Sequence, residues 1–131
     1  DNVCLIGIRS FEEEEKHLLD KLNVRIFYMD EVKQRGIDSV MKEALQRVTK
    51  NTAAFGVSLD IDSIDPVDAP GTDVSEPDGI RGHDLCQALT MLIHEPKLVG
   101  LEIAEFDPHR DKNHITEKLI ADIIRIVATG E

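Results

Sequence analysis

Short apolar runs alternate with longer segments of helical spacing along the whole chain of 131 residues. Runs such as Val3 to Ile8 lack the polar alternation that a strand with one face in water would show, so they predict strands buried on both faces. We predict strands over residues 3–8, 24–29, 53–61 and 98–106, and helices over 11–22, 38–48, 83–93 and 116–128. This order predicts an α/β fold in three αβα layers around a mainly parallel sheet. Because an apolar strand opens the chain with no polar leader, we expect a piece of a longer protein.

The charge balance limits the partners of the chain. Acidic residues number 26 against 15 basic ones, which gives a net charge of −11. Such a surface repels phosphate, so we expect neither a nucleic-acid nor a membrane partner. No apolar run is long enough for a membrane-spanning helix, and no secretory signal pattern is present. Cys4 and Cys86 lie inside apolar patterns, which is typical of buried reduced thiols in a cytoplasmic protein.

Two aspartates follow the third predicted strand. Asp60 and Asp62 come directly after the apolar Val57 to Leu59, and strand alternation predicts that both carboxylates lie on one face. Two such carboxylates repel each other unless a cation lies between them, and oxygen ligands suit hard or borderline divalent metals. Asp65 could turn back toward the same place. The alternative is a loop that opens with turn-forming aspartates, which are common in turns.

The fourth predicted strand also ends with an acid, Glu105. A carboxylate at this place could pair with a cationic substrate group such as a planar guanidinium. The alternative is an ordinary ion pair with a nearby lysine or arginine. Asp107, which precedes Pro108, is typical of a turn or a helix cap.

Other sites fail on spacing. An EF-hand loop starting at Asp60 would need glycine at its sixth position and an acid at its twelfth, where the chain has Asp65 and Gly71. No phosphate-binding glycine loop and no Gly-x-Ser-x-Gly turn is present. No two histidines have the spacing of a metal pair on a helix face, and we expect all five to lie at the surface: His17, His83, His94, His109 and His114.

The residues after the third strand resemble the signature of the ureohydrolase family, which includes arginase, agmatinase and formiminoglutamase. This stretch reads Ser58-Leu59-Asp60-Ile61-Asp62-Ser63-Ile64-Asp65-Pro66. Three further segments resemble the family at Ile6 to Ser10, Phe27 to Val32 and Gly100 to Pro108. The resemblance implies an arginase-like fold in which residues 1–131 are the C-terminal portion of a single ureohydrolase domain. The first two of these segments favour arginase within the family.

The resemblance also implies a chemistry. Asp60 would match the carboxylate that bridges two Mn²⁺ ions, Asp62 the carboxylate that binds one of them, and Asp65 an acid outside the ligand set. Glu105 would match the acid that receives the guanidinium or amidine end of a small-molecule substrate. For arginine the products would be ornithine and urea, while agmatine and formiminoglutamate remain open as substrates. Trimers or hexamers are expected by the same resemblance.

The chain departs from the family pattern in two ways. The family's other metal ligands, including its histidines, lie in Gly-Gly-Asp-His and Asp-Ala-His segments that this chain lacks, so we expect it to be inactive alone. The family usually continues with Gly-Thr-Pro after the position of Thr72, whereas this chain has Asp73 to Gly79 in a different pattern. That change keeps open a non-catalytic relative with an assembly or regulatory role, and a self-sufficient acidic binding module.

Overall fold

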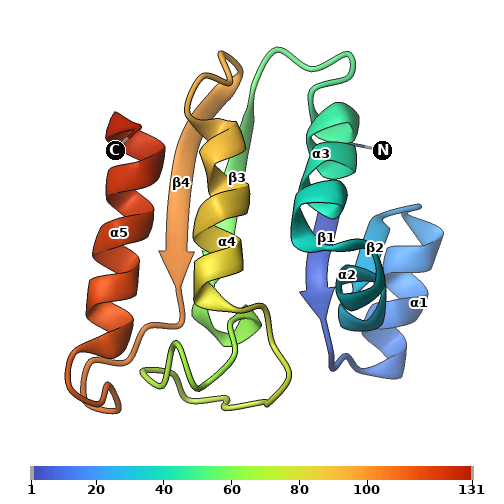
Figure 1. Cartoon of the computed structure of the whole chain (residues 1–131). Helices are drawn as coiled ribbons and strands as arrows, with labels where there is room; N and C mark the ends of the chain where they lie inside the picture. The colour runs from blue at the N-terminus through green and yellow to red at the C-terminus, as the bar shows by residue number, and fades with distance from the viewer. Residues whose placement is uncertain (1, 131) are drawn as a thin grey trace.

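The computed structural model describes residues 2–130, which form four strands and five α-helices (Figure 1). The strands are β1 (Cys4–Ile8), β2 (Arg25–Tyr28), β3 (Phe55–Asp60) and β4 (Leu98–Ala104). The α-helices are α1 (Glu13–Lys21), α2 (Met29–Arg35), α3 (Ile37–Val48), α4 (Gly82–Leu89) and α5 (Ile115–Thr129). Two 3₁₀ turns, η1 (Ile61–Ser63) and η2 (Thr90–Leu92), follow β3 and α4. The predicted alternation of strands and helices is therefore confirmed.

The strands pair in parallel, but they form two sheets within residues 2–130. β1 pairs with β2, and β3 pairs with β4. Figure 1 shows β1 and β4 pointing the same way, so the two parallel pairs run in one direction. Their carboxyl ends meet the long loop of residues 61–81 at one end of the molecule (Figure 1). The parallel arrangement is confirmed, and its division into two pairs is a feature that the sequence pattern did not predict.

The core lies between the strands and the helices α3 and α4. Val40, Met41 and Ala44 lie on the buried face of α3, and Leu85 and Leu89 on that of α4. The largest fully buried apolar side chains come from many elements and are Phe27, Ile61, Ile64, Leu89, Leu92, Ile123 and Val40. Each such side chain contributes about 1.5–3 kcal/mol relative to an exposed one. Packing of helices on strands therefore holds both sheets in one unit.

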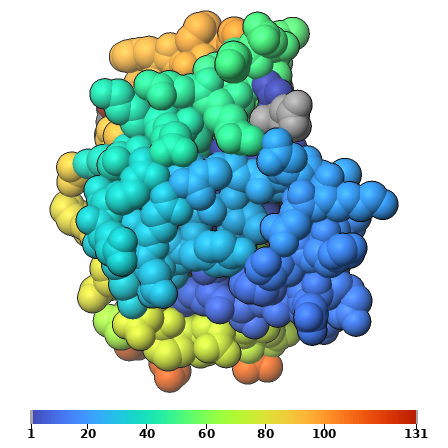
Figure 2. All heavy atoms as spheres, turned by 90° about the vertical axis from the view of Figure 1, so that its right-hand side faces the viewer, coloured from blue at the N-terminus to red at the C-terminus, as the bar shows by residue number. Residues whose placement is uncertain are grey.

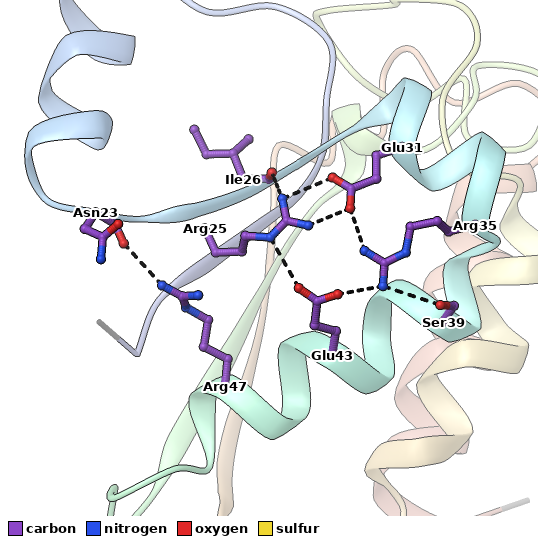
Figure 3. A network of polar contacts seen from close by, with 8 residues as sticks. All are labelled: Asn23, Arg25, Ile26, Glu31, Arg35, Ser39, Glu43 and Arg47. Carbon is purple, nitrogen blue, oxygen red and sulfur yellow. Dashed lines mark hydrogen bonds and ion pairs between the residues drawn. The ribbon is translucent and has the colours of Figure 1, made fainter.

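A ring of alternating charges ties β2 to α2 and α3 (Figure 3). Arg25 donates to Glu31 at 2.5 and 3.1 Å and to Glu43 at 3.3 Å. Arg35 closes the ring with bonds of 2.5 Å to Glu31 and 2.6 Å to Glu43. The Arg25 guanidinium also lies 3.8 Å from the ring centroid of Phe27. Hydrogen bonds from Arg25 and Arg35 lower the pKa of Glu31 despite its partial desolvation. A network of several charges contributes more to the stability of the fold than an isolated surface ion pair does.

The loop of residues 61–81 is ordered by contacts at several points. Ile64 and Ile80 form an isolated parallel bridge, and the Asp68 carboxylate accepts bonds from the side chain of Arg81 at 2.7 and 3.0 Å. Gly71 N–H donates to the buried hydroxyl of Thr116 at 2.8 Å. Figure 2 shows this loop, in yellow-green, beneath the blue and cyan atoms of the first half of the chain. The loop is thus part of the fold at the end where the strands terminate.

Two local predictions need correction. Residues 29–35 were not predicted as a helix, but they form α2, which buries Met29 and Val32 and carries acids in its first turn. Gly36, with φ of 80°, separates α2 from α3, a conformation that glycine adopts without strain. The first helix was predicted from residue 11, but α1 begins at Glu13, with Glu12 at the N-cap and no side-chain cap bond.

The cysteines and histidines lie largely where the sequence predicts. Cys4 and Cys86 are both free, although they are half-buried rather than fully buried. All five histidines are exposed. Within residues 2–130 no helix is both long enough and apolar enough to cross a membrane.

Replacing Gly71 by alanine tests the anchoring of this loop. A Cβ at Gly71 would lie 2.9 Å from Thr116 Oγ1 and 3.0 Å from both Asp111 Cβ and Phe106 Cε2. We expect Gly71→Ala to lower the free energy of unfolding by about 1–3 kcal/mol, measured by urea denaturation. Gly100→Ala is the control, because a Cβ there meets nothing within 4 Å. Equal stability of the two variants would contradict this account of the loop.

Candidate metal-binding and catalytic site

Asp60 and Asp62 lie together at the carboxyl end of β3, but not as the sequence predicted. β3 ends at Asp60, and Asp62 belongs to the 3₁₀ turn η1. The prediction of two carboxylates on one face of a strand is therefore wrong. Asp60 Oδ1 accepts a bond of 2.8 Å from the Asp62 N–H, and Ser63 Oγ donates to the Asp60 carbonyl at 2.6 Å. An Asp-x-Asp pattern fits a strand end and a capped turn equally well, and here the local side-chain bond favours the turn.

Asp62 is the most perturbed carboxyl of this region. Its pKa rises from 3.8 to about 6, first because of desolvation and then because of the negative charges of Asp60 and Glu105. Arg9 acts in the opposite direction. The Oδ1 atom of Asp62 is buried and has no hydrogen-bond partner within the described chain. A buried acceptor without a donor is uncommon and requires a physical explanation.

Glu105 follows β4 directly and comes near the two aspartates. The register of β3 on β4 pairs Asp60 with Ala104, so Glu105 lies one residue beyond the partner of Asp60. Its backbone has φ of 63°, in the left-handed region that costs a residue with a Cβ about 1–2 kcal/mol. The side chain is exposed and forms no ion pair with any residue from 2 to 130. The alternative of an ordinary ion pair with lysine or arginine is therefore wrong for the described chain.

Arg9 is a residue of the site whose role the sequence did not predict. Its guanidinium donates to the backbone carbonyl of Asp62, and also to those of Glu76 at 2.5 Å and Pro77 at 3.2 Å. Gly79 makes room for it, since a Cβ there would lie 2.7 Å from Arg9 Nη1 and 2.5 Å from the Asp65 nitrogen. The Gly7-Ile8-Arg9 segment carried the only sequence signal, and its contacts span 53 to 68 positions. Arg9 therefore holds the turn that carries Asp62.

The other acids near the site shape the backbone. Asp65 Oδ1 accepts from Val67 N–H at 3.0 Å, and Asp107 Oδ1 accepts from His109 N–H at 2.9 Å. Asp107 is thus confirmed as a turn residue. Asp111 caps α5 through bonds of 2.9 Å from the N–H groups of Thr116 and Glu117. Burial acts to raise the pKa of Asp111, but these bonds outweigh it and the pKa is lowered.

The carboxylates fit part of a metal site. Asp60 and Asp62 supply carboxylate oxygens, which a hard or borderline divalent cation prefers as ligands. One of these oxygens, Asp62 Oδ1, is buried and has no hydrogen-bond partner among the described residues. No group of three or more His, Cys, Asp or Glu side chains that could hold a metal ion occurs among residues 2–130. Among residues 2–130, Asp60 and Asp62 are therefore two candidate ligands and do not by themselves make a metal site.

Comparison with known sequences finds one family over nearly the whole chain. The sequence model of the Arginase family matches residues 1–129. An arginase from Brevibacillus brevis is 32% identical over 127 residues, which cover 97% of this chain and 43% of that protein. A formimidoylglutamase from Bacillus subtilis is 31% identical over 91% of this chain and 38% of its own length.

Comparison with solved structures agrees. The native arginase of Bacillus caldovelox matches with a TM-score of 0.93 at 29% identity, over 98% of this chain and 43% of that one. An agmatine ureohydrolase of Thermoplasma volcanium matches with a TM-score of 0.81 at 32% identity, over 95% of this chain and 40% of that one. The chain thus spans less than half the length of these relatives.

The raised pKa of Asp62 gives a prediction for pH dependence. The folded chain holds this proton more tightly than the unfolded chain, whose carboxyl has the ordinary value of 3.8. The contribution of Asp62 to stability is therefore fully present below about pH 4 and is lost as the pH rises through about 6. In metal-free buffer we expect Asp62→Asn to remove this part of the pH dependence, measured by denaturation between those values.

Carboxyl NMR titration checks the same group directly. Glu105→Gln is expected to lower the pKa of Asp62, because it removes one of the negative charges that raise it. Asp84→Asn serves as the control, since Asp84 is exposed on α4 and is not among the causes of the shift. An Asp62 pKa near 3.8 in the unaltered chain would contradict the electrostatics described here.

Proposed function

The chain belongs to the arginase family, and on this premise we propose that it forms part of a metal-dependent hydrolase of guanidino or amidino groups. The relatives are an arginase, a formimidoylglutamase and an agmatine ureohydrolase. The first and last of these act on a guanidino group, and arginine is the substrate we favour, with ornithine and urea as products. In this proposal residues 1–131 are the C-terminal portion of one ureohydrolase domain.

The observation that carries the proposal is the state of Asp62. One oxygen of this carboxylate is buried without a hydrogen-bond donor, and its ionisation is opposed by desolvation and by the charges of Asp60, Glu105 and Asp73. A bound cation would stabilise the ionised form. Asp60 and Asp62 would be among the residues that hold two Mn²⁺ ions. Such ions, when bound, lower the pKa of a shared water to about 7 and so supply hydroxide at neutral pH.

Arg9 and Glu105 have separate roles in this proposal. Arg9 orients Asp62 through the bond to its backbone carbonyl, and the carboxylate is left free to act as a ligand. Glu105 receives the planar cationic end of the substrate and holds its carbon toward the two aspartates. Its exposure, its lack of an ion pair within residues 2–130 and its left-handed backbone support this role.

We further propose a cytoplasmic location and a homo-oligomer, a trimer or hexamer, for the full-length protein. Both rest on the family alone. The alternative of a non-catalytic relative rested on the unusual residues 73–79. In the structure Asp73 pairs with Arg110 at 2.5 Å and Arg9 binds the carbonyls of Glu76 and Pro77, so this segment is anchored to the site.

Kinetics on a full-length arginase-family protein that contains this sequence test the proposal. We expect Asp60→Asn and Asp62→Asn each to lower Mn²⁺-dependent urea release from arginine on the order of 100-fold or more, because each removes charge that holds the ions. Bound manganese, measured by elemental analysis, should fall in both variants. Asp84→Asn is the control and should retain both metal and activity.

Glu105→Gln separates substrate binding from metal binding. We expect this variant to keep its manganese while kcat/KM for arginine falls, since the substrate loses its charge partner. Unchanged urea release in both aspartate variants would contradict the metal site and favour a non-catalytic relative. Full activity of Glu105→Gln would remove the role given to Glu105.

The 131-residue chain alone provides a further test. Because residues 2–130 offer fewer than three candidate ligands at one place, we expect no urea release from arginine with added Mn²⁺. Isothermal titration should show weak manganese binding. Tight, stoichiometric binding by this chain would instead support a self-sufficient acidic binding module.

A further inference from the structure

Asp78 and Gly79 form the single Asp-Gly pair of the chain, and the sequence has no Asn-Gly pair. Both residues lie near the end of the loop of residues 61–81. The side chain of Asp78 is 79% exposed, and its backbone has φ of 65°. This left-handed conformation is unfavourable for a residue with a Cβ, so the surrounding loop must maintain it.

The backbone of these two residues makes no hydrogen bond within residues 2–130. Neither the N–H groups nor the carbonyls of Asp78 and Gly79 take part in one. The chain is anchored on either side, because the Pro77 carbonyl accepts from Arg9 and the Ile80 N–H donates to a backbone carbonyl. The peptide unit between Asp78 and Gly79 can therefore turn without breaking a hydrogen bond.

The carboxyl group of Asp78 is held only weakly. Its one ion pair within residues 2–130 is with Lys33 Nζ at 3.3 Å, and the Lys33 side chain is itself 48% exposed. An exposed ion pair of this kind contributes little to stability. Gly79 has no side chain that would shield its backbone nitrogen. An electrophilic carboxyl carbon and an unshielded nitrogen are therefore adjacent in an unanchored part of the loop.

We propose that Asp78–Gly79 is a site of covalent modification, at which Asp78 converts to isoaspartate in the folded chain without an enzyme. The Gly79 nitrogen loses its proton and bonds to Cγ of Asp78. The C–OH bond of the carboxyl group breaks, one water leaves, and a cyclic imide forms. Water then adds to the imide. Breaking the bond from nitrogen to the main-chain carbonyl carbon gives isoaspartate, and breaking the bond to Cγ restores aspartate.

Isoaspartate adds one methylene carbon to the main chain between two anchored points. The backbone at Gly79 has little spare room, since a Cβ there would lie 2.5 Å from the Asp65 nitrogen and 2.6 Å from the Ile64 carbonyl carbon. The longer chain must therefore displace either the guanidinium of Arg9 or the bridge between Ile64 and Ile80. Because that guanidinium also holds the turn η1, modification of this loop loosens the candidate site.

Incubation of the 131-residue chain in warm neutral buffer tests the proposal, with a synthetic peptide of residues 73–84 as the unfolded reference. Isoaspartate is counted by enzymatic methylation with an isoaspartate methyltransferase and is located by chromatography and fragmentation of proteolytic peptides. We expect Asp78 in the folded chain to convert at a rate within about tenfold of that in the peptide, because no hydrogen bond must open first. The Asp38–Ser39 pair inside α3 is the internal reference and should convert more slowly.

Two glutamate variants are matched controls. Asp78→Glu keeps the negative charge, but the longer side chain closes the imide ring less readily, so conversion at residue 78 should fall about tenfold or more. Asp84→Glu lies on the exposed face of α4 and should leave conversion at Asp78 unchanged. Circular dichroism and thermal melting establish that both variants fold.

Hydrogen exchange tests the effect of the modification on the loop. After the converted chain is separated from the unconverted one, the amides of Asp65 and Ile80, which are bonded in the unmodified loop, should exchange faster.

Three results would overturn the inference. These are an Asp78 that stays unconverted in the folded chain while the peptide reacts, an equal yield of isoaspartate in the folded Asp78→Glu variant, and unchanged exchange of the Asp65 and Ile80 amides in the converted chain. The assay contains neither metal nor substrate. Its failure is therefore distinct from failure of the proposed hydrolase function.

Discussion

The guanidinium of Arg9 is the interaction on which the arrangement of the site depends. Arg9 follows β1, which belongs to the pair β1–β2. Its guanidinium donates to the carbonyl of Asp62, which follows β3 of the pair β3–β4. The same group binds the carbonyls of Glu76 and Pro77, and Gly79 leaves the space that it needs. No sheet hydrogen bonds join β1 to β3 within residues 2–130. The Arg9 contact is therefore a polar link between the two strand pairs, at the end where Asp60 and Asp62 lie.

The electrostatics of this end follow from that arrangement. Asp62 is held with one oxygen buried and unpartnered, and Asp60 and Glu105 oppose its ionisation. Such a group is unfavourable for the isolated fold and useful for holding a cation, which is typical of sites where stability and function conflict. The left-handed backbone of Glu105 is also unfavourable by itself, so the surrounding structure must maintain it. Both features support the proposal that Asp60, Asp62 and Glu105 act together at a functional site.

Much of the fold could be predicted from the sequence, because apolar periodicity reports which faces are buried. All four strands and four of the five α-helices lie within a few residues of their predicted positions. The helix α2 was missed because it follows β2 without an intervening turn residue. The division into two strand pairs could not be predicted, since the same apolar runs fit one continuous sheet and two separate ones. Asp60, Asp62 and Glu105 were found from their positions at strand ends, but the turn at Asp62 and the contacts of Arg9 depend on long-range geometry.

Family membership, the parallel strands and the paired aspartates support one central claim, that Asp60 and Asp62 are ligands of a two-metal centre in the complete protein. The most direct measurement is anomalous X-ray diffraction at the manganese edge, on crystals of a full-length protein that contains this sequence, grown with Mn²⁺. The account predicts two manganese peaks beside the carboxylates of Asp60 and Asp62. Manganese peaks only at other places would contradict it. So would the absence of any peak together with an Asp62 carboxylate paired to a lysine or arginine side chain.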